Sequence, residues 1–230
     1  MCLIWSCNNV QNQSKTATIQ KIERYPDGAT KSIKTLDRFG RKQGLAEEFY
    51  QGGRVKRKYH YVNDTLSGEC ETFFPNELRE SSRIFWMGRE VGPIVFYSMM
   101  GRVRLYNEYD FDGEIYYVQK YDDAGKIIKE EGVAVSPDIL LVGVTNDSLM
   151  RDSRINLYFF YAEPNGYQNK LTGYFDDKLV PIQYFASHVG LLQGQFQQQG
   201  KHTLRILSVL RDASGSIVSS DSVIKQLYVH

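Results

Sequence analysis

Aromatic and glycine residues recur at a constant spacing along the first half of the chain. Five aromatic residues stand 24 residues apart: Tyr25, Phe49, Phe73, Tyr97 and Tyr121. Three further rows keep the same step: Gly44, Gly68 and Gly92; Tyr61, Phe85 and Tyr109; and Gly53, Gly101 and Gly125, with Glu77 between Gly53 and Gly101. Self-similarity with a fixed period of this length is the signature of a repeat architecture.

The polar pattern within one period predicts two strands and a turn. Residues 54–61 alternate, with Arg54, Lys56, Lys58 and His60 on one face and Val55, Arg57, Tyr59 and Tyr61 on the other. Residues 45–50 precede them as a shorter strand, and Gln51-Gly52-Gly53 is a turn because glycine takes positive φ without steric cost. Each period therefore predicts one β-hairpin. An isolated hairpin is marginal in water, so neighbouring hairpins must stack.

The order of these residues resembles the MORN repeat (membrane occupation and recognition nexus) in its bacterial variant form. Three groups carry the resemblance: Gly44…Phe49-Tyr50…Gly53…Tyr61, Gly92…Phe96-Tyr97…Gly101…Tyr109, and Tyr121…Gly125…Gly132. The resemblance covers roughly residues 25–132 and implies a long, twisted, single-layer antiparallel sheet. The family also implies contact with a protein or a membrane surface, and some bacterial members are labelled antitoxins. No single activity follows from such a fold.

Beyond Gly132 the repeat stops and short stretches of apolar alternation take over. The expected strands are residues 139–144, 155–161, 168–175, 178–185, 190–196, 202–210 and 222–229. Short strands separated by frequent turns favour an immunoglobulin-like β-sandwich. We therefore expect an all-β protein in three parts. Residues 1–18 form a truncated lipoprotein signal and tether, residues 19–132 form antiparallel MORN-like β-hairpin repeats, and residues 133–230 form the sandwich.

The first residues resemble the end of a bacterial lipoprotein signal. Leu3-Ile4-Trp5-Ser6-Cys7 places apolar residues and a small residue before a cysteine, so Cys7 is the expected site of lipid attachment. A full signal is longer than the residues before Cys7, so this interpretation places the true start upstream of Met1. It predicts a lipid-anchored protein of the bacterial cell envelope, on the periplasmic side or at the surface. The alternative is a short leader with incidental cysteines, which leaves a cytoplasmic location open.

Charge gives no sign of a nucleic-acid partner. The formal net charge is +1, so no global field attracts nucleic acid or a membrane. The charges are nevertheless graded along the repeats: residues 21–58 hold eleven basic and five acidic residues, whereas residues 102–132 lean acidic. Such a gradient favours a charged partner at one end of the array, or it marks solvated strand faces and guarded sheet edges.

The sequence contains no recognisable catalytic or metal-binding pattern. The four histidines, His60, His188, His202 and His230, are not within metal-ligand spacing of one another. Cys70 has no partner at a plausible spacing, so we expect no internal disulfide and interpret it as a small buried strand residue. Asp176 and Asp177 are adjacent and predict a turn rather than an acid pair. We therefore expect a protein that is not an enzyme, with no cofactor and no metal.

Four aromatic residues of the repeats are the candidate binding residues: Tyr59, Tyr61, Phe85 and Tyr109. The strand period places Tyr59 and Tyr61 on one face, and the 24-residue step extends this row to Phe85 and Tyr109. Such a row is either the shared interior of the repeats or an open binding stripe. As a stripe it suits a protein partner of an envelope scaffold. The alternatives are a carbohydrate-binding envelope protein, whose rings stack on sugars, and a cytoplasmic antitoxin-like partner protein.

Overall fold

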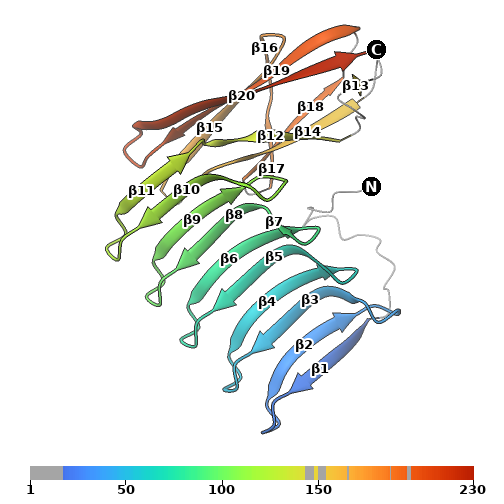
Figure 1. Ribbon diagram of the computed structural model, residues 1–230, viewed down its shortest axis with the longest axis vertical. Helices are drawn as coiled ribbons and strands as arrows, with labels where there is room; N and C mark the ends of the chain where they lie inside the picture. Colours follow the sequence, from blue (N-terminus) through green and yellow to red (C-terminus); the bar gives the residue numbers. More distant parts are fainter. Residues whose placement is uncertain (1–17, 143–147, 150–153, 165, 187, 196–197) are drawn as a thin grey trace. The chain divides into compact units, whose positions relative to one another are not determined.

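The computed structural model describes residues 18–142, 148–149, 154–164, 166–186, 188–195 and 198–230 (Figure 1). These residues form strands and turns, with no helix among them, and nearly all strand pairs are antiparallel. The expected all-β class is therefore confirmed. Cys7 and the tether lie outside the described residues. The chain divides into two compact units, the first ending at Glu90 but including Phe96–Arg102, and the second formed by Val91–Val95 and Val103–His230.

The first unit is a series of hairpins in which each strand pairs with the next one in the chain. Its strands are β1 (Ile19–Arg24), β2 (Thr30–Leu36), β3 (Lys42–Phe49), β4 (Val55–Val62), β5 (Thr65–Phe73), β6 (Arg79–Trp86) and β7 (Arg89–Glu90). The following strand, β8 (Gly92–Tyr97), runs across the division between the units. All seven strands of this unit belong to one sheet, so the expected stacking of hairpins is side by side.

The turns at one end of the hairpins share one geometry. The amide of Gly28 donates to the carbonyl of Tyr25 at 2.9 Å, and that of Gly53 donates to Tyr50 at 2.9 Å. Each of these glycines has positive φ, and the register shifts by one residue beside each turn. Glu77 occupies the equivalent position with φ of 68° and donates its amide to Phe74 at 2.9 Å. The turn geometry is therefore kept where the glycine is absent.

Hydrogen bonds between successive turns explain the 24-residue period. The Tyr25 hydroxyl donates to the carbonyl of Phe49 at 2.7 Å, and the Tyr50 hydroxyl donates to the carbonyl of Phe73 at 2.8 Å. Further along, the side-chain amide of Asn76 donates to the carbonyl of Met99 at 2.9 Å. At these three turns a side chain thus satisfies a backbone carbonyl of the next repeat, which favours repeats of one length.

Small residues line the buried positions of this sheet. Ser32, Ala46, Cys70, Thr72 and Ser81 are buried, and the larger Ile84 and Asp37 are buried in the same unit. Cys70 is thus a buried strand residue, as expected. Burial raises the pKa of its thiol, and the nearby Glu90 and Glu71 carboxylates act in the same direction. Small side chains at these positions leave room for the larger tyrosine, phenylalanine and arginine side chains between them.

The second unit contains strands of three sheets. The first sheet contributes β9 (Val103–Tyr109), β10 (Ile115–Tyr121) and β11 (Ile127–Gly132). The second has the order β12-β14-β18-β17, with bounds Val135–Val142, Arg154–Tyr161, Val189–Gln195 and Gln183–Ala186. The third has the order β13-β20-β19-β15-β16, with bounds Ser148–Leu149, Ile217–Val229, Gly200–Arg211, Gln168–Phe175 and Lys178–Val180; its β13–β20 pair is parallel.

The sheet β12-β14-β18-β17 and the sheet β13-β20-β19-β15-β16 contribute side chains to common apolar clusters. In one cluster Leu157 and Leu192 meet Leu204, Leu227 and Val229. In the other, Val135, Phe159 and Tyr161 meet Leu171 and Ile206. Members of each set come from both sheets, so this part of the chain has a hydrophobic core of its own.

The structure refines the expected strands of the second half. Residues 168–175 form β15 as expected, whereas the expected strand over 178–185 is wrong because Pro181 separates β16 from β17. Proline lacks the amide hydrogen that a sheet ladder requires. The short strand β13 was not expected. Asp176 and Asp177, with φ of 46° and 61°, form the turn between β15 and β16.

Strands β9–β11 form part of the same compact unit as the C-terminal strands. The Val133 amide donates to the Tyr116 carbonyl at 3.0 Å, and the rings of Phe111 and Phe160 lie 4.4 Å apart. The repeat pattern ends at Gly132, but these contacts continue across that position.

Candidate functional site

Two of the predicted binding residues lie together on the first unit. Tyr59 pairs with Ala46 and Cys70 across β4, and its ring lies 6.0 Å from that of Tyr61 on the same face. Both side chains are half-buried. Phe85 on β6 is also half-buried and pairs with Gly68. Tyr109 is half-buried too, but it lies at the end of β9 in the second unit.

Cationic side chains cover the two tyrosine rings. Lys42 Nζ lies 4.6 Å from the centre of the Tyr61 ring, and the Arg57 guanidinium lies 5.8 Å from that of Tyr59. Arg57 also donates to the Tyr59 hydroxyl at 3.4 Å and lies 3.9 Å from the Glu48 carboxylate. These cation–π contacts fix the rings while leaving them part-exposed. Burial raises the pKa of both tyrosines, so they are neutral at physiological pH.

We call this group the tyrosine face: Arg57, Tyr59 and Tyr61 of β4 with Lys42 and Glu48 of β3. The strands described for the first unit all belong to one sheet, so this unit contributes no second layer over the face. Tyrosine and arginine are enriched in the buried centres of protein interfaces, whereas lysine and glutamate are depleted there and are more typical of the polar rim.

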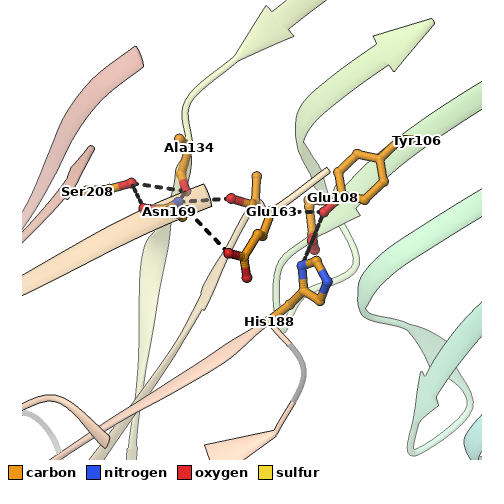
Figure 2. Close-up of polar contacts among 8 residues, drawn as sticks. Tyr106, Glu108, Ala134, Glu163, Asn169, His188 and Ser208 are labelled. Atoms are coloured by element: carbon orange, nitrogen blue, oxygen red, sulfur yellow. Dashed lines mark hydrogen bonds and ion pairs between the residues drawn. The ribbon is translucent and has the colours of Figure 1, made fainter. Parts of the chain in front are cut away.

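The second unit contains a buried group of ionisable side chains that the sequence did not indicate (Figure 2). Glu108 on β9 is completely buried, and its Oε1 atom lies 2.6 Å from Nδ1 of His188. The Tyr106 hydroxyl donates to the same Glu108 oxygen and lies 3.2 Å from His188 Nδ1. Because 80 residues separate Glu108 from His188 in the chain, no local spacing could have signalled this pair.

Several contacts hold the His188 ring in place. The ring stacks on Tyr161 with 5.9 Å between centroids and a 19° interplanar angle. The backbone of His188 has φ of 64°, and its carbonyl accepts the Tyr161 amide at 3.1 Å. Burial alone would lower the pKa of His188, but the Glu108 carboxylate outweighs burial, so the pKa is raised. Burial also raises the pKa of Glu108, although the neighbouring His188 and Tyr106 act in the opposite direction. We assign a buried ion pair from the 2.6 Å contact between the two side chains.

A chain of hydrogen bonds connects this ion pair to the C-terminal strands (Figure 2). The Glu163 amide donates to the Tyr106 hydroxyl at 3.2 Å, and the Glu163 carboxylate accepts the Asn169 amide at 3.3 Å. The Asn169 side chain donates to the carbonyls of Ala134 at 3.0 Å and Ala162 at 2.9 Å, and it accepts from Ser208 at 2.8 Å. The Asn169 side chain on β15 thus forms hydrogen bonds to the residue before β12, to the residue after β14 and to β19.

The polar cluster is incompletely paired on the β9–β10 side. Four buried side-chain atoms have no hydrogen-bond partner among the described residues: Asn107 Oδ1, Glu108 Oε2, Tyr116 OH and Gln119 Nε2. Glu108 therefore carries two donors on one oxygen and none on the other. A buried unpaired acceptor is costly, so Glu108 depends on the contacts that its other oxygen makes with His188 and Tyr106.

Asp176 and His202 form a second ion pair in this unit. His202 Nδ1 lies 2.6 Å from Asp176 Oδ2, and the Thr203 amide donates to the other Asp176 oxygen at 2.8 Å. The Asp176 side chain is 41% exposed, in contrast to Glu108. Asp176 thus holds the β15–β16 turn against β19, which is a structural contribution.

Among the residues that the structure describes, no group of three or more histidine, cysteine or acidic residues is arranged to hold a metal ion. Among the same residues, no helix is long and apolar enough to cross a membrane.

Comparisons with known proteins name no relative for this chain. No protein-family model matches it, and no curated protein matches it.

Proposed function

We propose that this chain is a non-enzymatic scaffold protein that binds another protein through the tyrosine face. The observation that carries the proposal is the pair of part-exposed rings of Tyr59 and Tyr61, 6.0 Å apart and flanked by Arg57 and Lys42. Tyrosine and arginine dominate the energetics of protein interfaces. Rings already fixed by neighbouring cations lose little conformational entropy on binding.

The arrangement of the cations favours a protein over a sugar as the partner. Sugar-binding sites need an open ring face for stacking, whereas Lys42 lies 4.6 Å over the Tyr61 ring. The same cation can pair with a carboxylate at the rim of a protein interface. A carbohydrate partner therefore remains an outcome of the experiment below rather than a second proposal.

The proposed family and fold details accord with the geometry of each unit. Turns that are hydrogen-bonded at 24-residue intervals support a MORN-like repeat for the hairpins. Two sheets with common apolar clusters support an immunoglobulin-like β-sandwich for the C-terminal strands. Neither part has a geometry that implies a particular reaction.

We further propose that the scaffold is lipid-anchored through Cys7 in the bacterial cell envelope. The support is the sequence Leu3-Ile4-Trp5-Ser6-Cys7, which lies outside the described residues. Cys7→Ser in the native gene is expected to move the protein from the membrane fraction to a soluble fraction. An unchanged membrane fraction, or native protein with a free thiol at Cys7, would contradict the anchor.

Site-specific photo-crosslinking in the native cell tests the binding surface. Benzoylphenylalanine replaces Tyr61 in one variant and His60, on the opposite face of β4, in the other. We expect a discrete protein adduct from position 61 only, and its loss when Arg57→Ala is added. Equal adducts from both faces, or no adduct together with specific binding on a glycan array, would overturn the proposed protein-binding face.

A further inference from the structure

One edge of the third sheet in the second unit is left open by the sequence. Strand β15 pairs with β19 along its whole length, from Gln168 to Phe175. On its other side it pairs with β16 only at Gly173–Phe175. Strand β16 ends at Val180 because Pro181 cannot donate to the ladder and turns the chain away. Among the described strands, none pairs with residues 168–172 on that side.

The outward-facing backbone groups of this edge can be assigned. The Asn169 amide donates to the Glu163 carboxylate, so it points away from β19. Alternate residues of an antiparallel strand direct their backbone groups to opposite sides. Leu171 therefore also directs its amide and carbonyl to the open side, whereas Lys170 and Thr172 pair with β19. The Asn169 contact is long, at 3.3 Å, and is easily exchanged for a strand carbonyl.

Two clefts lie along this edge and have Lys170 in common. One, of about 650 Å³, is lined by polar and aromatic side chains that include Glu163, Tyr184 and Arg211. The other, of about 510 Å³, is lined mainly by apolar side chains that include Leu171, Val180 and Ile182. Both volumes lie in the range of natural ligand sites. Together they provide what strand addition requires, which is a free ladder with side-chain pockets beside it.

The side chains around the edge set the chemistry of the occupant. Lys170 is exposed and Arg211 is half-exposed, with one guanidinium nitrogen donating to the Gly215 carbonyl, while Glu163, a carboxylate that lines the first cleft, accepts the Asn169 amide. The ring of Tyr184 is 59% exposed beside them. An acidic side chain therefore suits the first cleft, and an apolar side chain suits the second. A peptide that continued the direction of β16 would meet the apolar cleft first.

We propose that the open edge of β15 binds an extended peptide segment of a partner protein by strand addition. The segment runs antiparallel to β15 and carries an apolar residue followed, towards its C-terminus, by an acidic residue. Its backbone pairs with Asn169 and Leu171, and its acidic side chain pairs with Lys170 and Arg211. This site is separate from the tyrosine face and does not depend on it.

An array of random seven-residue peptides, probed with the full chain, supplies the ligand for the test. The enriched peptides are expected to place an acidic residue after an apolar one. For the best peptide, Lys170→Glu and Arg211→Glu should each weaken binding about tenfold by fluorescence polarisation. The matched control Lys201→Glu, an exposed lysine on β19, should not. A control peptide of the same sequence, N-methylated at alternate residues, should lose binding, because its methylated amides cannot donate hydrogen bonds to the open edge of β15.

Amide hydrogen exchange by NMR tests the edge without any ligand. In the free protein the Leu171 amide should exchange at least about tenfold faster than those of Lys170 and Thr172. The bound peptide should slow Leu171 selectively. Equal protection of all three amides in the free protein would overturn the open edge. No enriched peptide, or full binding by the N-methylated control peptide, would overturn strand addition. Tyr59→Ala should leave these results unchanged, which separates this site from the tyrosine face.

Discussion

Removing the His188 side chain tests the buried ion pair of the second unit most severely. His188→Ala leaves the Glu108 carboxylate completely buried with Tyr106 as its one remaining described donor. Breaking a buried pair in this way costs about 3–5 kcal/mol, because a charge stays behind without compensation. The matched control is His202→Ala, which removes a histidine at the same 2.6 Å distance from a carboxylate that is 41% exposed. Water can solvate that carboxylate, so the control should cost about 1–2 kcal/mol.

The pH dependence of the free energy of unfolding provides an independent test of the same ion pair. The pKa of His188 is raised in the folded protein, so its contribution is fully present below the unfolded pKa near 6.5. The contribution is lost as pH rises through the folded pKa. Wild-type protein should therefore lose more stability than His188→Ala between pH 6 and pH 9. The pKa of His202 is raised as well, so the wild-type protein contains a second contribution with the same pH dependence. The difference between wild type and His188→Ala isolates the contribution of His188.

The assay is urea denaturation monitored by hydrogen exchange in peptides from β14 and β19, so that the unfolding of the second unit alone is measured. Adding Glu108→Gln to His188→Ala should restore part of the loss, because it removes the buried charge. The reasoning is refuted if His188→Ala costs no more than His202→Ala, or if both proteins show the same pH dependence.

Four further substitutions have expected outcomes. Glu77→Gly should stabilise the first unit by about 0.5–1 kcal/mol, because glycine relieves the positive φ of 68°. Gly53→Ala should destabilise the same unit by about 1 kcal/mol. A lower melting temperature for Glu77→Gly, or a higher one for Gly53→Ala, would contradict the turn assignment. Gly190→Ala should destabilise the second unit by about 3 kcal/mol, since the new methyl group would lie 2.2 Å from Phe159 Cζ; a urea midpoint equal to wild type would show that the packing is looser than described. Tyr61→Ala should cost only about 1 kcal/mol because the ring is half-buried; a loss of about 3 kcal/mol or more would make it a core residue instead.

The sequence was sufficient to predict the hairpin repeats because their determinants are local. Glycine and tyrosine recur where each turn must take positive φ or bond to the next, as in the Tyr25–Phe49 contact. The face shared by Tyr59 and Tyr61 followed from the strand period alone. Glu77, which stands in the row of Gly53 and Gly101, adopts a positive φ of 68° without being glycine, and its residue type did not indicate this.

The buried cluster could not be predicted because its members meet only after folding. Glu108 follows Tyr106 by two residues on the same face of a strand, an arrangement that many surface residues also have. His188 is an isolated histidine far along the chain. The open edge of β15 depends on where β16 ends. Pro181 was visible in the sequence, and weighing it as a strand breaker would have separated β16 from β17.

The central claim is that the tyrosine face is the protein-binding surface, and titration calorimetry with the partner captured by the Tyr61 crosslink tests it most directly. The informative variants are Tyr61→Ala and, as the control, Lys56→Ala, an exposed residue on the opposite face of β4. If the face is the binding surface, Tyr61→Ala should weaken the partner's affinity by at least about thirtyfold, corresponding to about 2 kcal/mol, while Lys56→Ala leaves it unchanged. Equal affinities for wild type and Tyr61→Ala, or equal losses for both variants, would contradict the account.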